Sequence, residues 1–315
     1  MARRKKGNPI NGWIVLDKSA GMTSTQAVAA VRRIYDAQKA GHAGTLDPLA
    51  TGILPIALGE ATKTVSYAVD GEKAYCFTVR WGEQTNTDDA EGSVVQTSDR
   101  RPTVAEIEAL LPRYVGTIMQ TPPKFSAIKV EGNRAYDLAR EGEPVELMPR
   151  EVDIDALRLI DVPDDDTAVF AAECGKGTYV RALARDLGVE LGCYGHVIAL
   201  RRTRVGPFSE VEAVTLKELE DAAVQPATVE TEGRAGLAGA LKPVQAALRE
   251  LTMLNVGQAD AARIGRGQAI LIRGRDAPAM TGDAYAIWRG CPLAIGILER
   301  GEFRPVRVFN LAPER

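Results

Sequence analysis

Residues 41–52, Gly-His-Ala-Gly-Thr-Leu-Asp-Pro-Leu-Ala-Thr-Gly, place the tightest local constraint on how this chain can fold. The stretch holds three glycines, one proline, one of the two histidines of the chain and a single carboxylate. Glycine allows backbone torsions and close approaches that other residues cannot make, and Pro48 fixes the turn just after Asp47. An Asp beside Pro and Gly most often only accepts backbone hydrogen bonds in a turn. The composition of the whole stretch instead predicts a loop that holds one acid in a fixed place.

Composition sets the size of the fold and limits the kind of nucleic-acid surface that the chain can carry. At 315 residues, 45% of them hydrophobic, the chain can bury a real core and form one large domain plus a small one. The formal net charge of -3 argues against a uniformly basic face for phosphate contacts. Basic residues gather at 3–6 and at 201–204, and arginines outnumber acids nine to six from residue 251 onward. Any RNA site must therefore be a local patch.

Cysteine and histidine usage argues against a metal site. The four cysteines lie far apart without a Cys-x-x-Cys pair, and the chain has only two histidines. This usage suits buried thiols in a reducing cytoplasm. No apolar run approaches the roughly 18 to 20 residues that a membrane span needs. Residues 1–11 contain four basic residues but no hydrophobic region after them, so they predict a flexible basic arm of a cytoplasmic protein and not a signal peptide.

Hydrophobic periodicity predicts several strands and helices. Residues 12–18 predict a short buried strand, and either Thr23 or Ser24 can cap the helix that follows. Residues 73–81 alternate as a strand that places Tyr75 among large apolar residues, so pattern alone makes Tyr75 a core aromatic. The polar loop at 85–92 lacks the spaced acids of an EF-hand and is interpreted as solvated. Further strands are expected at 168–174, 264–272, 284–287, 293–298 and 304–309, and helices at 59–63 and 103–114.

The string at 41–52 closely resembles the motif around the catalytic aspartate of the TruB family, the bacterial tRNA pseudouridine synthases that modify the T loop. Two other strings resemble further signatures of that family: Lys-Gly-Thr-Tyr-Val-Arg at 176–181, followed by Asp-Leu-Gly at 186–188, and Gly-His-Val-Ile-Ala-Leu-Arg-Arg-Thr at 195–203. The Gly-Lys-Gly-Thr string lacks the spacing of a phosphate-binding P-loop, which argues against a nucleotide hydrolase. The three signatures stand in the family's order and cover most of residues 12–207.

The resemblance implies an α+β fold with two domains. A pseudouridine synthase catalytic domain, with a central mainly antiparallel mixed sheet, would span residues 12–215 and carry a thumb insertion at about 122–150. A helical or linker segment would follow at 216–250, and a small β-rich PUA-like RNA-binding domain at 251–315. Three residues depart from the Pro, Tyr and Ser that are usual in the family: Ser19, Phe125 and Gly175.

The resemblance also assigns roles to three catalytic residues. Asp47 would be the nucleophile, attacking either the sugar carbon or the base, since covalent catalysis by a carboxylate is established chemistry. Tyr75 would stack on the base and act as general base, which is compatible with a packed ring whose hydroxyl reaches a cleft. Arg181 would orient Asp47, because a planar guanidinium holds a carboxylate in one orientation and favours its ionised form. In isolation, Arg181 would be interpreted as a surface arginine.

Substrate-binding roles follow in the same way, each with a structural alternative. His42 would help to flip the target uridine by occupying its stacking space, unless it only hydrogen-bonds within its own loop. Tyr179 and Leu200 would contact the base, although pattern alone makes Leu200 a core residue. The residues predicted to contact RNA phosphate are basic residues near the motifs or in the thumb: Lys18, Lys124, Lys129 and Arg134.

The function implied is conversion of uridine to pseudouridine at position 55 in the T loop of tRNA. The reaction breaks the N-glycosidic bond, turns the uracil and rejoins it through carbon, so it formally needs no cofactor, metal or redox partner. The expected partner is the T stem-loop of tRNA, no membrane is expected, and the protein is expected to be a monomer. Two other functions stay open: a carboxylate-dependent glycosidase, which needs a second acid near Asp47, and a non-catalytic RNA-binding module.

Overall fold

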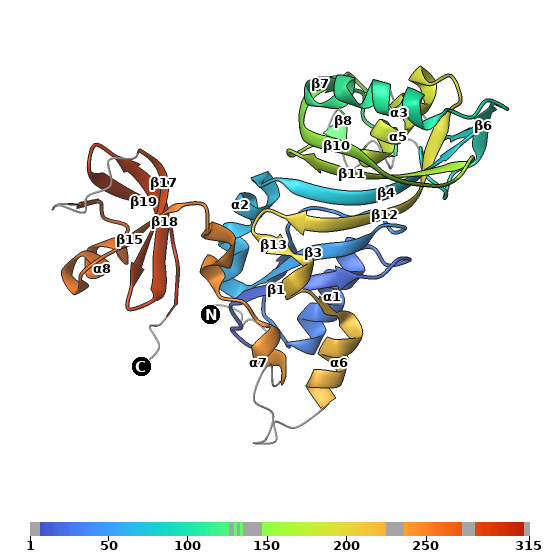
Figure 1. Ribbon diagram of the computed structural model, residues 1–315. Coiled ribbons are helices and arrows are strands. Elements are labelled where there is room, and N and C mark those ends of the chain that lie inside the picture. Colours follow the sequence, from blue (N-terminus) through green and yellow to red (C-terminus); the bar gives the residue numbers. More distant parts are fainter. Residues whose placement is uncertain are drawn as a thin grey trace.

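The computed structural model describes residues 7–125, 147–224, 236–272 and 281–311, together with the backbone of the short pairs 129–130 and 133–134. The chain builds a large sheet flanked by helices and, to one side of it, a smaller sheet near the C-terminus (Figure 1). None of the described helices is long and apolar enough to cross a membrane. The same residues contain no group of three or more His, Cys, Asp or Glu side chains that could hold a metal ion.

The large sheet has ten strands, and most neighbouring strands run antiparallel. Only two of its pairs, β1 with β14 and β3 with β12, are parallel. This arrangement confirms the mainly antiparallel mixed sheet. In order across the sheet, the strands are β14 (Val214–Thr215), β1 (Gly12–Lys18), β3 (Thr51–Leu58), β12 (Gly195–Val205), β4 (Lys73–Trp81), β11 (Thr167–Cys174), β10 (Arg150–Asp164) and β7 (Gly116–Gln120), with β2 (Ala40–His42) on β3 and β13 (Phe208–Ser209) on β12.

Two helices begin at side-chain caps that the sequence supplies. The Thr23 side chain accepts a hydrogen bond from the Gln26 backbone amide, and the Gln26 side chain accepts one from the Thr23 backbone amide, which starts α1 (Ser24–Ile34). Thr103 and Glu106 form the same reciprocal cap at the start of α3. The remaining helical elements outside the smaller sheet are η1 (Gly59–Thr64), α2 (Val65–Asp70), α3 (Val104–Leu110), η2 (Leu111–Tyr114), α5 (Val180–Glu190), η3 (Glu210–Glu212), α6 (Leu216–Val224), α7 (Gly236–Ala240) and η4 (Val244–Leu248).

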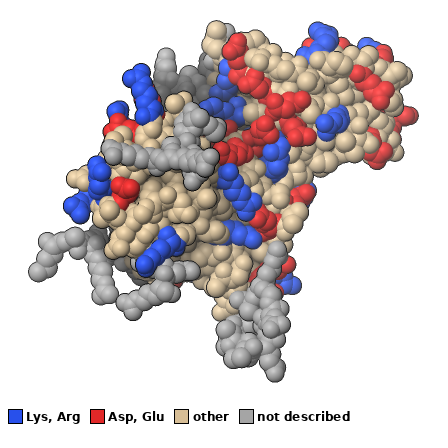
Figure 2. Space-filling view, turned by 60° about the vertical axis from the view of Figure 1, so that its left-hand side comes forward, with Lys and Arg blue, Asp and Glu red and all other residues tan. Residues whose placement is uncertain are grey.

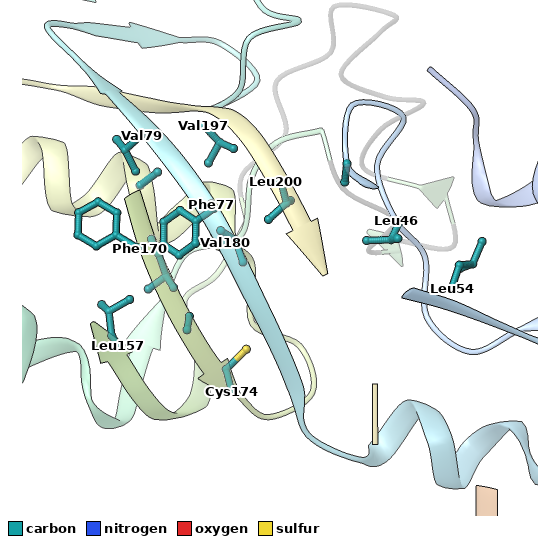
Figure 3. Packing of buried hydrophobic residues seen from close by; sticks show 14 of the residues in the cluster. Leu46, Leu54, Phe77, Val79, Leu157, Phe170, Cys174, Val180, Val197 and Leu200 are labelled. Carbon is teal, nitrogen blue, oxygen red and sulfur yellow. The ribbon is translucent and has the colours of Figure 1, made fainter. Parts of the chain in front are cut away.

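The main core lies on the face of β4 that the alternating sequence predicts. Phe77 and Trp81 are fully buried there and both contact Phe170 of β11, at ring-centroid distances of 5.4 and 6.2 Å. Leu200 of β12 is paired with Phe77 and lies in the same cluster (Figure 3). Tyr75 is only partly buried and packs at the edge of this cluster. The core therefore fixes the strands whose ends carry the predicted site residues.

The C-terminal unit is a five-stranded sheet with one helix. Its strand order is β15 (Thr252–Asn255), β17 (Gly282–Trp288), β18 (Cys291–Glu299), β19 (Glu302–Val308) and β16 (Ile270–Leu271). The prediction of a strand over 264–272 is wrong in its first part, because Ile264 ends the helix α8 (Gln258–Ile264). The two buried residues of that helix, Ala261 and Ile264, are three positions apart, which is a helical and not a strand spacing.

The segment between the two units packs on the large sheet. The backbone of Lys242 exchanges two hydrogen bonds with Trp13 of β1, both 2.8 Å long. The Trp13 indole also donates to the Val244 carbonyl at 3.3 Å. Tyr285 and Ile295 of the smaller sheet belong to the same buried cluster as Trp13. The predicted helical or linker segment at 216–250 thus contributes packed contacts to both units.

Candidate active site

Asp47 lies in the loop between β2 and β3, and the first residue of α1 holds this loop. The Ser24 hydroxyl donates to the Leu46 carbonyl at 3.0 Å and accepts from the Leu46 amide at 2.8 Å. Ala50 then closes a turn by donating its amide to the Asp47 carbonyl at 3.1 Å. The Asp47 side chain keeps 34% of its surface exposed. The loop therefore fixes the backbone on both sides of a carboxylate that stays accessible.

Arg202 of β12 also holds this loop through hydrogen bonds to backbone carbonyls. Its buried guanidinium donates to the carbonyls of Gly44, Thr45 and Ile53, at 3.0, 3.3 and 2.8 Å. Gly52 has a φ of +97°, and a Cβ there would lie 2.2 Å from the Arg202 carbonyl oxygen. The glycine is needed because β3 and β12 approach each other closely at this point.

The predicted basic cluster at 201–204 is not a free positive patch. Arg202 is buried under the loop, and Arg201 binds Asp17 through two hydrogen bonds of 3.0 and 2.8 Å. Arg204 pairs with Glu72 and Glu173. Basic and acidic side chains lie interspersed on the face that Figure 2 shows. Sequence clustering misled here because the acids that neutralise these arginines come from distant strands and loops.

The prediction that Lys18 contacts phosphate is wrong. Its side chain is 1% exposed, and its ammonium group donates to the carbonyls of Ser19, Met22 and Pro48 at 2.9, 2.8 and 3.3 Å. These bonds use all three donors of the group. Burial lowers the pKa of Lys18, whereas the negative charge of Asp47 raises it. Lys18 therefore ties the end of β1 to the Asp47 loop.

Arg181 joins three parts of the site. Its Nε lies 2.9 Å from Asp47 Oδ2, and its Nη1 lies 3.2 Å from Asp89 Oδ2. Nη1 also donates to the Thr87 carbonyl and Nη2 to the Phe125 carbonyl, each at 2.9 Å. The Arg181 side chain is only 5% exposed. The predicted pairing of Arg181 with Asp47 is present, and its catalytic role stays a prediction.

The charge of Asp47 depends on a balance between burial and its neighbours. Burial raises the pKa of the Asp47 carboxyl, and Arg181 lowers it without cancelling the effect of burial. Asp89 raises the pKa further, while Lys18 lowers it. The expectation that Arg181 favours the ionised acid is thus correct in sign, although burial outweighs it.

The loop at 85–92 is buried at its acids, so its interpretation as a solvated loop is wrong. Asp88 pairs with Arg185 at 3.0 Å, and Asp89 pairs with Arg181. Burial raises the pKa of Asp88 to about 6, although Arg185 and Arg181 oppose this. Arg181 and Arg185 stand four residues apart and so share one face of α5. Two arginines on the inner face of an amphipathic helix were the signal for two buried acids.

Tyr75 and His42 lie in the electrostatic field of Arg202. Burial raises the pKa of the Tyr75 hydroxyl, the Arg202 guanidinium lowers it, and Asp47 raises it. Burial and then Arg202 lower the pKa of His42, while the backbone of Gly44 opposes them. The His42 ring is therefore neutral near pH 7. The charge of Asp47 therefore acts on the Tyr75 hydroxyl, and the predicted role of Tyr75 as general base requires that the two groups interact.

The other predicted residues lie in three different settings. Tyr179 immediately precedes α5, and the Gln120 side chain holds its backbone through hydrogen bonds of 3.2 and 2.8 Å. Leu200 is buried, as the core interpretation predicts, and its contact with the base stays a prediction. Lys124 is exposed. Two further candidates pair through their backbones in the hairpin of β8 (Lys129–Val130) and β9 (Asn133–Arg134), while their side chains, like most of the predicted thumb, lie outside the described residues.

Comparison with known proteins shows which family models and relatives match this chain. Residues 32–180 match the model of the TruB family pseudouridylate synthase N-terminal domain, and residues 181–249 match that of the tRNA pseudouridylate synthase B C-terminal domain. The chain is 57% identical to tRNA pseudouridine synthase B of Bradyrhizobium diazoefficiens, an alignment that covers 98% of this chain and 91% of the relative. It is 56% identical to the protein of the same name from Chelativorans sp., covering 99% of this chain and all of the relative.

Solved structures show the same fold. A chain in the crystal structure of a Cbf5-Nop10-Gar1 complex superimposes with a TM-score of 0.74 at 26% identity, covering 96% of this chain and 85% of that one. A chain in the structure of an H/ACA RNP bound to a substrate RNA containing 2'-deoxyuridine gives a TM-score of 0.74 at 23% identity, covering 98% of this chain and 91% of that one.

Proposed function

Because this chain belongs to the TruB family of pseudouridylate synthases, we propose that it converts uridine to pseudouridine in tRNA, at position 55 of the T loop. Its relatives at 56 and 57% identity are named tRNA pseudouridine synthases, which supports tRNA as the substrate. The observation that carries the proposal is the partly exposed Asp47 carboxylate, 2.9 Å from a buried Arg181 whose Nη1 and Nη2 donate to other groups. One accessible acid therefore lies in direct contact with a buried guanidinium that is anchored at its other end.

Asp47 is the proposed nucleophile, and Arg181 is its positioning partner. Attack of the carboxylate on the sugar carbon or on the base gives a covalent intermediate that splits a difficult isomerisation into easier steps. The uracil then turns, rejoins the ribose through carbon, and loses the proton on that carbon. Tyr75, whose hydroxyl is influenced by both Arg202 and Asp47, is the proposed base for that proton. Substrate, product and protein exchange no net electrons or atoms with any other molecule.

The same geometry suits a flipped uridine. A base inside a folded stem-loop cannot be reached until it leaves the stack. His42 is neutral and lies five residues before Asp47, so its ring can take the vacated stacking space without adding a buried charge. Tyr179 and Leu200 are proposed to contact the base once it has entered the site. Outside the pocket, exposed Lys124 is a proposed phosphate contact, and Lys129 and Arg134 remain candidates.

The C-terminal sheet is proposed to add an RNA contact outside the active site, as the PUA-like assignment implies. Arg263, Arg266 and Arg300 are exposed there, and Arg289 is exposed with its guanidinium 4.9 Å from the centre of the Trp288 ring. Arginine and aromatic side chains of this kind bind phosphates and stack on unpaired bases. We place the protein in the cytoplasm as a monomer acting on tRNA.

Asp89 does not supply the second acid that the glycosidase alternative needs. Asp89 is the carboxylate that shares Arg181 with Asp47, but it is buried and both of its oxygens are occupied. Oδ1 accepts from the Thr87 hydroxyl at 2.6 Å and from the Glu91 amide at 3.0 Å, and Oδ2 accepts from Arg181. An acid or base for glycoside hydrolysis must reach the substrate. Asp89 can position Arg181 but cannot take that role.

The test is pseudouridine mapping of unmodified tRNA transcript after incubation with purified protein. Wild type is compared with Asp47→Asn and with Asp165→Asn, which changes an exposed acid in the turn between β10 and β11. Wild type and Asp165→Asn should convert the T-loop uridine, and Asp47→Asn should bind the RNA without converting it. Conversion at another tRNA position would contradict the assignment to position 55. RNA binding without conversion by wild type would leave the non-catalytic binding module as the function.

A further inference from the structure

Arg150, the first residue of β10, carries a guanidinium that no described residue neutralises. It lies on the strand face that also carries Val152 and Ile154, both buried, and it is paired in register with the buried Gln120 of β7. Its Nε is buried without a hydrogen-bond partner. Across the described part of the chain, no acid forms an ion pair with Arg150 and no acceptor forms a hydrogen bond with it. An inward-facing charge therefore stands at the rim of the sheet without a counterion.

The one recorded contact of this guanidinium is with the ring of Tyr179. The Arg150 Cζ atom lies 5.4 Å from the ring centre, which is a cation–π distance. Gln120, the neighbour of Arg150 across β7 and β10, holds the Tyr179 backbone through both its amide oxygen and its amide nitrogen. The two side chains thus fix Tyr179 from one side of the sheet. Tyr179 stands two residues before Arg181, the partner of Asp47, so Arg150 lies beside the proposed active site.

The surroundings of Arg150 favour an anion. The first turn of α5 contains no acid, and the positive end of the helix dipole lies at Tyr179. The acids nearest in the proposed site, Asp47 and Asp89, are already paired with Arg181. A partly buried charge costs free energy unless an opposite charge or hydrogen-bond acceptors satisfy it. The missing partner must then come from outside the described protein.

We infer that Arg150 binds a backbone phosphate of the RNA next to the target uridine while its plane supports the Tyr179 ring. The inference rests on the proposed function, since it assumes an RNA substrate in this site. A guanidinium can donate two parallel hydrogen bonds to phosphate and still stack on an aromatic ring. Unpaired bases in RNA stack on tyrosine, so the ring and the phosphate contact would hold one nucleotide together. Arg150 is a positioning residue in this assignment.

The experiment measures binding of a tRNA T stem-loop transcript at a series of salt concentrations. All proteins carry Asp47→Asn so that the RNA is not converted during titration. Arg150→Gln should weaken binding roughly tenfold at low salt and reduce the slope of log affinity against log salt by about 0.7 to 1. Arg150→Lys keeps the charge and should keep most of the slope. The matched control is Arg158→Gln, on the outer face of the same strand with a side chain 65% exposed, which should change neither quantity.

An unchanged salt slope in Arg150→Gln would overturn the inference and reduce Arg150 to a packing partner of Tyr179. An equal loss of slope in Arg158→Gln would also overturn it, because the effect would then be one of general charge. Conversion of tRNA by the protein with native Asp47 is measured separately. If that protein fails to convert but the slope changes as expected, the proposed function fails and the phosphate contact stands. If it converts tRNA and Arg150→Gln leaves the salt slope unchanged, the proposed function stands and the phosphate contact fails.

Discussion

Replacing Asp89 by Asn removes one of the two carboxylates that hold Arg181. Both groups are almost fully buried, and Oδ2 of Asp89 lies 3.2 Å from Nη1 of Arg181. Hydrogen bonds to charged groups contribute about 1.5 to 3 kcal/mol, and breaking a buried ion pair costs about 3 to 5 kcal/mol when it strands a charge. Arg181 keeps Asp47 and two backbone carbonyls in the variant. We therefore expect the range for a hydrogen bond to a charged group and not that for a stranded charge, which means a loss of about 2 to 3 kcal/mol in the free energy of unfolding.

Urea unfolding measures this loss, as a fall in the midpoint at constant m-value. The control is Asp166→Asn, which removes a carboxylate that pairs with Arg101 at the surface and is 53% exposed. Surface pairs contribute at most about 1 kcal/mol. If Asp89→Asn loses no more stability than this control, the argument that Asp89 anchors Arg181 is refuted. Since the charge of Asp89 raises the pKa of Asp47, the variant should also shift the acid limb of kcat/KM to lower pH.

Two further changes test the loops around the site. Asp88 has a folded-state pKa of about 6, above its ordinary value of 3.8, so the folded state binds more protons between these values and stability should fall as pH rises through them. Urea unfolding at pH 4 to 7 should show about 2 kcal/mol of this dependence in wild type, and Asp88→Asn should lose it. Gly52→Ala should cost at least about 2 kcal/mol, because it forces a side chain to a φ of +97° and against the Arg202 carbonyl. Gly41→Ala, where a Cβ meets nothing within 4 Å, should unfold at nearly the same urea concentration as wild type, and equal losses in both would contradict the steric argument.

Local causes explain what the sequence predicted well. The caps at Thr23 and Thr103 depend only on residues three positions away, so they can be predicted from a short stretch. The alternation of residues 73–81 predicts the buried face of β4 because a strand has a fixed period of two. The motif at 41–52 predicts a constrained loop because its glycines and Pro48 act on their own backbone. In each case the sequence signal lies within the element that it predicts or a few residues from it.

Long-range pairing explains what the sequence did not reveal. Lys18 and Arg202 resemble exposed basic residues in sequence, yet both are buried with their donors directed at backbone carbonyls of the Asp47 loop. Carbonyl groups leave no trace in the amino-acid sequence, because every residue carries one. The acids at 88 and 89 were misinterpreted for a related reason. Their partners, Arg181 and Arg185, stand more than ninety residues later in the chain.

The fold as a whole, more than the motif, sets the charge of the Asp47 carboxylate. Burial opposes ionisation of Asp47, since it raises the pKa of the carboxyl. Arg181 of α5 opposes this by direct contact. Lys18 of β1 and Arg202 of β12 also interact with the Asp47 charge, although their donors are bound to backbone carbonyls. The cations that hold the loop in shape thus also stabilise the ionised acid inside it. A loop of the same sequence without these strands would keep its turn but lose the electrostatic environment that a nucleophile needs.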